Sequence, residues 1–532
     1  MRLIPTCTTL QAFLSTLLLS TVLIPAPLHA QWAELTSGTE ASQYLYAMQL
    51  RGWWSGESSA LRPFTLGATR RWMRDSVPVH PWQSRFTATP RRVELLRPAV
   101  MVTYAAGDFP WSYNDGAEWR GLGLTTTGTV GVSMHMGPLS LRLEPVFFHS
   151  QNRDFVLDGG TSRGVNPFVD AARPRFIDLP QQFGRRPYAR LDPGQSELRL
   201  DLGPFTAGLS TMNRSWGPGL RHSLLFTGNA PGIPHLFVGT SDAWRTPIGR
   251  LSGQVYYGKA SPSGFEPVSP GRYRLVTGLV GSWQPRSGRG FEIGAARLYH
   301  KFWPADGFSA KTLTAPFGSF FTDVQIYFGG EADNQLLSAF TRWRSEAQSF
   351  EVYAEFGRND RSLDVRDVLV EPEHNSAWIA GFAKRLDRQD DAFWLIRGDV
   401  ANGRIGSISR LNRPQVFFYE HAPVTQGHTQ RGQLLGTSLL ERTGGLELSV
   451  DRYGQGGRFG VMLTSRAMPD GSGEGQVRAR ARTQWALEST GVRFIGNHEI
   501  SVRAGYVLDV NRQPTRDARS AYLSVGSRWS LQ

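Results

Sequence analysis

The chain contains a single cysteine, Cys7, and this residue precedes the first apolar run. A basic start at Arg2, an apolar run from Leu10 to Ile24 and small residues before Gln31 are typical of a cleaved secretory signal peptide. The alternative is a membrane anchor, for which the run is short. We therefore expect residues 1–30 to be removed. The mature protein then has no disulfide, no thiolate nucleophile and no cysteine metal site.

Lysine is nearly absent. Among 58 basic residues, the only lysines are Lys259, Lys301, Lys311 and Lys384. The other basic residues are arginines, whose planar guanidinium binds carboxylates and phosphates in two places at once. With a net charge of +13, this composition favours acidic polysaccharide or lipopolysaccharide as a partner. A bias towards arginine codons in a GC-rich genome is the alternative explanation. Nucleic acid is not expected as a partner of an exported chain, despite the positive charge.

After the signal peptide, the sequence lacks any run of 18 apolar residues, which excludes a spanning helix. Short segments of alternating polar and apolar residues recur instead, for example Leu139–Leu143, Phe350–Gly357, Leu446–Asp451 and Tyr522–Trp529. Alternation of this kind is typical of strands with one apolar face. A bilayer accepts only helices and closed barrels. The fold is therefore either an outer-membrane β-barrel or a soluble all-β sandwich.

Two features favour the barrel. The polar faces carry charges of both signs, as in a wet or salt-bridged lumen, and the strands recur over residues 96–532 without a domain break. A span of this length holds roughly 18 tilted strands with their connections. We therefore predict an all-β fold, a transmembrane antiparallel β-barrel of roughly 18 strands, located in the cell outer membrane.

Residues 31–95 differ from the rest and predict a small helical or irregular segment. Ser37 and Glu40 have the spacing of a capping box. The apolar residues that follow lie on one face of a helix: Ala41, Tyr44, Leu45 and Met48. A second helical piece is predicted around Arg70–Arg74. The alternative, a disordered leader, is disfavoured by the aromatic content of the segment.

Signatures of catalysis are missing. The sequence has no G-x-S-x-G and no H-E-x-x-H motif, and the histidines of the mature chain are scattered. Glu351 and Glu355 alternate on the polar face of a strand, where salt bridging across a lumen explains them. We expect a protein that is not an enzyme and has no cofactor and no metal. A glycan-processing enzyme is the remaining alternative.

The stretch 194–240 contains a block rich in glycine and proline, from Trp216-Gly217-Pro218-Gly219 to Asn229-Ala230-Pro231-Gly232-Ile233-Pro234-His235. Glycine and proline break strands and favour fixed turns. We therefore expect a rigid loop that plugs the lumen, binds a ligand, or does both. Flat aromatic faces, fixed polar groups and arginine are what sugar binding requires. The candidate glycan-binding residues of this block are Trp216, Arg221, His222, Asn229 and His235.

Structural roles remain open for these residues, because a histidine in an aromatic-lined loop more often makes a structural hydrogen bond. Further aromatic candidates outside the block are Trp53, Trp54, Trp119 and Trp343. Tryptophan is equally typical of the aromatic girdles at membrane interfaces.

The central block resembles the Wzi family of capsule assembly proteins, which carry Trp216-Gly217-Pro218-Gly219, Ser223-Leu224 and Asn229-Ala230-Pro231 in this order and at about this spacing. Further resemblance lies in three segments: Asn114–Gly121, Ser150–Phe155 and His428–Gly436. The resemblance implies an outer-membrane barrel with 18 strands and a small helical segment at its periplasmic side. It also implies a role in holding capsular polysaccharide at the cell surface.

We therefore expect a monomeric outer-membrane protein that attaches or assembles capsular or other surface polysaccharide without catalysis. Its partners would be the polysaccharide, outer-membrane lipid and lipopolysaccharide. The alternative function is a porin-type diffusion channel, since a porin shares the barrel and the charged lumen.

Overall fold

The computed structural model describes most of the chain after residue 91 and shorter stretches before it. The described residues are 33–35, 39–53, 58, 60–65, 69, 80–83, 92–111, 115–158, 166–305, 307–317, 333–359, 365–388, 391–404, 417–468, 482–513 and 516–529. The predicted signal peptide, the helical piece predicted around Arg70–Arg74, Ser37 of the predicted capping box and Trp54 lie outside them.

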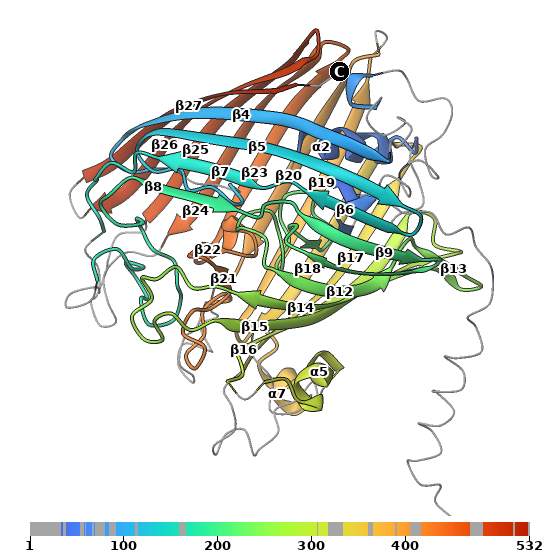
Figure 1. The fold of residues 1–532 in the computed structure, drawn as a ribbon, viewed down its shortest axis with the longest axis horizontal. Coiled ribbons are helices and arrows are strands. Elements are labelled where there is room, and N and C mark those ends of the chain that lie inside the picture. Colours follow the sequence, from blue (N-terminus) through green and yellow to red (C-terminus); the bar gives the residue numbers. More distant parts are fainter. Residues whose placement is uncertain are drawn as a thin grey trace, which may run out of the picture.

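The strands of the described residues form one closed antiparallel barrel (Figure 1). Its wall segments are β4 (Val93–Gly107), β5 (Gly123–Met136), β6 (Leu139–Leu143), β7 (Val146–Ser150), β8 (Tyr188–Asp192), β9 (Glu197–Leu202), β10 (Phe205–Ser210), β12 (His235–Thr240), β13 (Trp244–Thr246), β14 (Gly249–Ala260), β15 (Arg274–Pro285), β16 (Phe291–Phe302), β17 (Asp333–Ser345), β18 (Phe350–Asn359), β19 (Ser376–Asp387), β20 (Phe393–Asn402), β23 (Gly444–Gly454), β24 (Gly457–Met468), β25 (Arg482–Ile495), β26 (His498–Gln513) and β27 (Arg516–Trp529). Pairing of β27 with β4 closes the cylinder.

Three strands of the wall are interrupted and consist of two segments each: β6 with β7, β8 with β9, and β12 with β13. With each pair taken as one strand, the described barrel has 18 strands, which confirms the predicted fold class.

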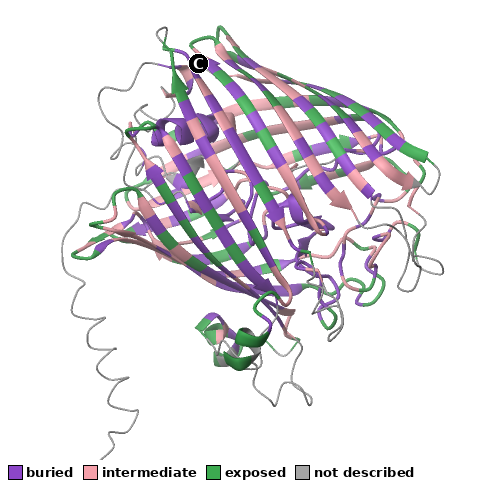
Figure 2. Cartoon of the chain, turned by 180° about the vertical axis from the view of Figure 1, so that it is seen from behind, coloured by how far each residue is buried: buried purple, intermediate pink, exposed green. Residues whose placement is uncertain are grey.

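Side chains alternate between the outside and the inside of the wall (Figure 2). On β18, Val352 and Phe356 are 38% and 46% exposed on the outside, whereas Glu351 and Glu355 are 0% and 2% exposed on the inside. The apolar face therefore points outward around one closed cylinder, whose backbone hydrogen bonds are satisfied between strands. This arrangement suits lipid and places the protein in the outer membrane. No described helix is long and apolar enough to cross a membrane.

The inward charges are paired across strands. Glu351 accepts a hydrogen bond from Arg344 Nε at 3.0 Å and lies 3.5 Å from Arg342, which confirms the predicted lumen salt bridge. Glu355 differs from the prediction. It accepts hydrogen bonds from Ser338 Oγ at 2.5 Å and from the backbone amide of Leu224 at 3.1 Å, because the central block fills this part of the lumen.

The two ends of the barrel differ in their connections. Short turns join the strands at one end, for example Gly137-Pro138 between β5 and β6 and Gly496-Asn497 between β25 and β26. We call this the short-turn end. The long connections, such as 108–122, 151–187, 211–234 and 403–443, emerge at the opposite end, the long-loop end. In bacterial barrels the short turns face the periplasm and the long loops face the cell exterior.

The helix α2 (Glu40–Leu50) lies inside the barrel near the short-turn end, beside β19 (Figure 1). Its N-cap is Thr39, whose hydroxyl accepts a hydrogen bond from the Ser42 amide at 3.3 Å. A β-hydroxyl at the N-cap satisfies an otherwise free amide of the first turn. Every residue from Ala41 to Leu50 is buried, rather than one face as the periodicity predicts, because the lumen encloses the helix.

Short strand pairs and helices complete the described fold. Three pairs lie outside the wall ladder: β1 (Ala33–Leu35) with β3 (Phe64–Thr65), β2 (Leu61–Arg62) with β11 (Ser215–Trp216), and β21 (Thr429–Gln430) with β22 (Gln433–Leu434). The remaining helices are α5 (Ala310–Thr314), η1 (Ala315–Phe317), α7 (Val365–Val370) and η2 (Ser438–Leu440). Pairing of β2 with β11 joins the N-terminal segment to the central block inside the lumen.

Candidate functional site

The central block folds into the lumen, and Trp216 forms its core. Trp216 is 1% exposed and packs edge-on against Phe226 and Tyr256, with ring centroids 4.9 and 5.8 Å apart. Gly232 lies so close to the backbone that a Cβ atom there would be 1.8 Å from the carbonyl oxygen of Thr211. Glycine and proline therefore permit a compact plug, as the sequence predicts.

Arg221 and His222 contact an inward carboxylate of the wall. Arg221 Nε lies 3.0 Å from Glu447 Oε1, and His222 Nε2 lies 3.2 Å from Glu447 Oε2. The other ring nitrogen of His222 lies 2.7 Å from Thr437 Oγ1. Both side chains therefore link the central block to β23, and His222 also links it to Thr437, which precedes η2.

His235 is held as a neutral imidazole by its two partners. Its Nδ1 lies 2.6 Å from the carbonyl oxygen of Ile233, which can only accept, so Nδ1 carries the proton. Its Nε2 then accepts from Arg214 Nε at 3.0 Å. The ring also stacks on Tyr256 at 4.4 Å. The contacts of His235 are therefore all with the protein itself, as expected for a histidine that makes a structural hydrogen bond.

Asn229 differs from the other four candidates, because it lines a cleft at the long-loop end. Its side-chain amide donates to the carbonyl oxygen of Leu434 at 3.0 Å, which fixes it beside the β21–β22 hairpin. The structure therefore brings Trp216, Arg221, His222 and His235 into protein contacts within the lumen, and only Asn229 into the cleft. Glycan binding by the block stays a prediction.

The cleft has a volume of about 190 Å³ and lies between the plug and the ends of β24, β25 and β26. Aromatic, basic, amide and acidic side chains line it, the acidic ones being Asp158, Asp170 and Glu441. Aromatic rings come from Phe109, Trp111, Trp119 and Phe155; guanidinium groups come from Arg442, Arg466, Arg482 and Arg512; carboxamides come from Gln181, Asn229, Gln433 and Gln484. Four separate connections and three strand ends supply these residues, so the cleft exists only in the folded barrel. We call it the mouth cleft.

Two arginines of the mouth cleft lie over aromatic rings. The guanidinium carbon of Arg466 is 4.3 Å from the ring centroid of Trp111, and that of Arg512 is 4.5 Å from the ring centroid of Phe109. Cation–π contact holds each ring and each positive charge in a fixed relative position. Ser520 further fixes Phe109, whose amide lies 3.2 Å from the serine hydroxyl.

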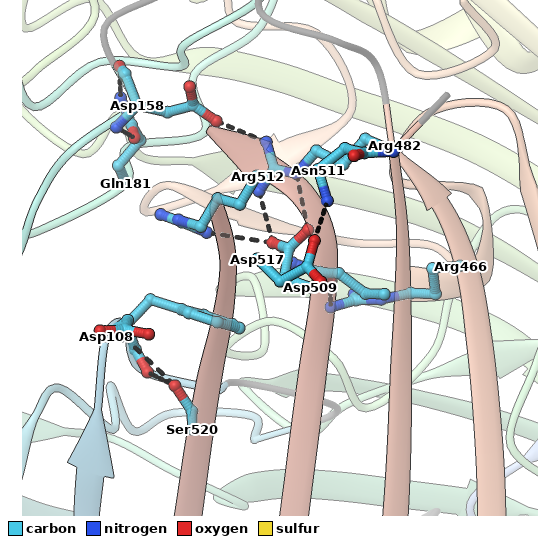
Figure 3. A network of polar contacts seen from close by, with 12 residues as sticks. Asp108, Asp158, Gln181, Arg466, Arg482, Asp509, Asn511, Arg512, Asp517 and Ser520 are labelled. Atoms are coloured by element: carbon cyan, nitrogen blue, oxygen red, sulfur yellow. Dashed lines mark hydrogen bonds and ion pairs between the residues drawn. The ribbon is translucent and has the colours of Figure 1, made fainter. Parts of the chain in front are cut away.

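A polar network orients the arginines at the strand ends (Figure 3). Both oxygens of Asp509 accept from Arg482, from Nε at 2.8 Å and from a terminal nitrogen at 2.6 Å. Arg512 lies 3.3 Å from the same carboxylate, and Arg482 also pairs with Asp158 of the long connection 151–187. Bidentate pairing fixes a guanidinium in one plane. Asp509 therefore pairs with two arginines, and Asp158 supplies the second carboxylate of this network.

A second ion-pair group lies at the back of the mouth cleft. Arg442 pairs with Asp170 and lies 3.4 Å from Glu420, which also contacts Arg173 at 3.4 Å. Burial raises the pKa of Glu420 to about 7, against the opposing effect of Arg173. Burial likewise lowers the pKa of Arg442 to about 10. Glu420 therefore titrates near neutral pH, and Arg442 stays charged there.

This arrangement can bind a sugar chain that carries acidic groups. Aromatic faces contact the apolar side of pyranose rings, and carboxamides donate to and accept from hydroxyl groups. Arginines already held in position can bind a carboxylate or a phosphate with little further loss of side-chain entropy. The cleft thus has the groups that the sequence assigned to the central block, in a different place.

The arginines of the cleft could not be recognised from the sequence, since arginine at the end of a strand has no distinctive local pattern. A signal was nevertheless present in the segments that carry the family resemblance. Trp119, Phe155, Asn229 and Gln433 each belong to one of those segments, and all four line the mouth cleft. Trp343, another aromatic candidate, is 42% exposed on the outer wall. Trp53 lies under Arg385, 4.4 Å from ring to guanidinium.

Among the described residues, one group has the geometry of a metal site: His222, Asp399 and Glu447, whose ligand atoms lie within 4.8 Å of one another. Each ligand already has a partner in the protein. Tyr353 donates to Asp399, Arg221 pairs with Glu447, and His222 contacts Thr437. These contacts account for the group without an ion.

A closed barrel with an apolar exterior, and with described segments folded into its lumen, defines an outer-membrane β-barrel protein. No protein-family model matches the chain, and no curated protein matches its sequence. Among solved structures it is similar to Wzi of Escherichia coli, described as an outer-membrane protein involved in group 1 capsule assembly and a carbohydrate-binding β-barrel. The TM-score is 0.63 at 11% identity, over 94% of this chain and 100% of that one.

Two other outer-membrane proteins superpose less well. OccAB2 of Acinetobacter baumannii and OpdQ of Pseudomonas aeruginosa give TM-scores of 0.41 and 0.40 at 9% and 10% identity, each over 83% of this chain and 98% of the other. At 11% identity, the likeness to Wzi shows the barrel fold. Membership of the Wzi family stays a prediction.

Proposed function

We propose that this protein holds an acidic surface polysaccharide, such as a capsule, at the outer face of the outer membrane by non-covalent binding in the mouth cleft. The observation that carries the proposal is the cleft itself, in which Trp111 and Phe109 lie under Arg466 and Arg512 at the long-loop end. The fold it shares with Wzi, a carbohydrate-binding barrel, adds support.

The filled lumen supports attachment over diffusion. The helix α2 lies near the short-turn end, and the central block packs against inward residues of β14–β17, β19 and β20 in one apolar cluster with Trp216. A porin needs a continuous aqueous path through these segments. In planar bilayers, purified protein should show no steady conductance. A large, stable conductance would favour the porin alternative.

Binding is tested with the purified barrel and acidic polysaccharide extracted from the surface of the host, with neutral dextran as the comparison ligand. Arg512→Gln removes one charged contact of the cleft and should weaken binding by about 10- to 100-fold, since a hydrogen bond to a charged group contributes about 1.5–3 kcal/mol. The matched control is Arg493→Gln, an exposed arginine of β25 near the short-turn end. Equal loss in both variants, or tight binding of dextran, would contradict the proposal.

Two further tests address the role in the cell and the absence of catalysis. Deletion of the gene in its host should release polysaccharide into the medium, and unchanged cell-associated polysaccharide would contradict the attachment role. Incubation of the protein with the same polysaccharide should leave its chain length unchanged. Shortened chains would favour an enzyme.

A further inference from the structure

The wall of the barrel is incomplete in its long-loop half. β10 ends at Ser210 and β12 begins at His235, and these two residues face each other at the last register position of the pair. Above that level β8 pairs with β7 on one side and has no ladder partner among residues 166–305, all of which are described. Two strands are therefore missing between β8 and β14, which corresponds to a gap of about 14 Å at ~4.8 Å per strand.

Features of the sequence explain why the wall is interrupted here. The chain leaves the wall after Ser210 to form the central block and returns at His235. On the other side, Pro193 and Gly194 interrupt the strand made of β8 and β9. Gly194 has a φ of +62°, and a Cβ atom there would lie 2.3 Å from the carbonyl oxygen of Glu144. Proline also lacks the amide that a ladder requires.

The β21–β22 hairpin closes the gap from inside. At its tip, the amide of Arg431 donates to the carbonyl oxygen of Ser261, next to the end of β14, at 2.8 Å. The guanidinium of the same residue lies 3.0 Å from Asp192, the last residue of β8. Arg431 of the β21–β22 hairpin thus joins the two edges of the interrupted wall.

Outside the gap lies an apolar groove of about 700 Å³. Its floor is a row of leucines that face one another across neighbouring strands: Leu141, Leu198, Leu209 and Leu236. The segment with α5 lies over one side of it, because Tyr257 donates from its hydroxyl to the carbonyl oxygen of Leu313 at 2.5 Å. The leucines of the floor belong to the lipid-facing wall, and Phe308 and Leu313 of the segment with α5 border the groove.

Lys259 and Trp303 line the groove at the end of β14 and after β16, and further cation–π pairs lie on neighbouring residues. Lys259 Nζ is 4.3 Å from the ring centroid of Tyr273 and 4.8 Å from that of Trp303, and the guanidinium of Arg272 is 3.6 Å from the ring of Phe302. Aromatic side chains of this kind lie at the level of lipid headgroups, and cations there attract phosphate.

We propose that this groove binds an acyl chain of a phosphorylated glycolipid of the outer leaflet, of the lipid A type, whose phosphate lies beside Lys259 and Arg272. Three observations converge: an apolar floor continuous with the hydrocarbon, a helix that borders it, and a positive rim on the side of the long loops. The site lies on the outer wall, whereas the mouth cleft lies within the long-loop end, so the inference does not depend on glycan binding there.

The probe is hexa-acylated, bis-phosphorylated lipid A with a photoreactive diazirine in one acyl chain, incorporated with the purified full-length protein into phosphatidylcholine nanodiscs. After irradiation, mass spectrometry locates the cross-links. We expect them to concentrate on 198–211, 234–238, 257–259 and 308–314. Cross-links distributed evenly over the wall, for example equally on Leu487 and Leu523 of β25 and β27, would overturn the proposal.

Filling the groove is the sharper test. Leu209→Trp and Leu236→Trp keep the wall apolar but occupy the floor, and each should abolish the concentrated cross-links. The control is Leu487→Trp, because Leu487 is 54% exposed on the wall and Leu209 is 56% exposed. If a tryptophan variant fails to assemble, Leu313→Ala replaces it as the groove variant, because it changes the bordering helix and not the wall. Retained cross-linking in all folded groove variants would overturn the proposal.

The positive charge at the rim of the groove determines which class of lipid binds there. Lys259→Gln should weaken cross-linking of lipid A by about fivefold, since a cation near the membrane surface contributes about 1 kcal/mol to binding of an anionic lipid. Phosphatidylglycerol with the same diazirine chain should label the groove less strongly than lipid A, and equal labelling would contradict a glycolipid occupant. Binding of lipid-free polysaccharide should be unchanged in Leu209→Trp, which separates this site from the mouth cleft.

Discussion

The two ends of the lumen are closed in different ways. Near the short-turn end, α2 packs in an apolar cluster in which Tyr44 stacks on His80 at 4.3 Å and Phe393 lies parallel to Tyr453 at 4.7 Å. At the long-loop end, charged and aromatic side chains surround the mouth cleft. The apolar cluster needs no ligand, whereas the ion pairs around the mouth cleft consist of charged groups that can exchange partners. This difference agrees with the proposed binding surface at the long-loop end.

The largest effect should follow Leu45→Asp, because Leu45 is 0% exposed in the centre of the cluster around α2. A buried carboxylate without a partner should destabilise the packing of α2 by about 4 kcal/mol or more. Amide hydrogen exchange in residues 40–50 should then increase strongly, and current through planar bilayers should appear. Unchanged exchange in a folded Leu45→Asp barrel would show that α2 does not seal this end.

A slightly smaller effect is expected for Gly232→Ala in the central block. The new Cβ atom would lie 1.8 Å from the carbonyl oxygen of Thr211, so the backbone must shift, at about 3 kcal/mol. Hydrogen exchange in residues 211–234 is the measurement. Gly491→Ala is the control, since nothing lies within 4 Å of its added Cβ atom. Similar exchange in both variants would contradict a rigid block.

Much of this fold could be predicted from the sequence, because alternation with period 2 carries the information that decides a barrel wall. Glu351 and Val352 lie on opposite sides of β18 as their alternation requires. The loop formed by the central block could also be predicted, since glycine and proline cannot continue a strand. The mouth cleft was not, because Trp111, Arg466 and Arg512 meet only through the closure of the barrel. Local patterns carry no information on such distant pairings.

The response to pH should separate the two ends. The raised pKa of Glu420, about 7, means that the folded state binds a proton between the ordinary carboxyl pKa and 7. Stability from this group is therefore fully present at about pH 4 and is lost as the pH rises through 7, by at most about 3 kcal/mol. Protection factors, which exclude the intrinsic rise of amide exchange with pH, should fall in residues 417–430 over that interval and should not fall in residues 40–50.

Glu420→Gln is the matched variant, because the amide cannot ionise and should remove the dependence of the protection factors on pH in residues 417–430. If the dependence persists in Glu420→Gln, another group causes it.

The smallest effect is expected for Arg221→Ala, which tests the candidate site of the central block. Loss of the contact with Glu447 should destabilise the plug by about 1–2 kcal/mol, because His222 still contacts that carboxylate. Binding of acidic polysaccharide should be unchanged. If Arg221→Ala abolished binding while exchange in 211–234 stayed normal, the binding site would lie in the block and not in the mouth cleft.

Mapping of the bound polysaccharide tests the central claim most directly. Amide hydrogen exchange of the full-length protein is compared with and without the acidic polysaccharide. Binding in the mouth cleft predicts protection in 108–111, 151–158 and 432–442, with exchange in 40–53 near the short-turn end unchanged. Protection confined to 211–228, or no protection at saturating polysaccharide, would contradict it.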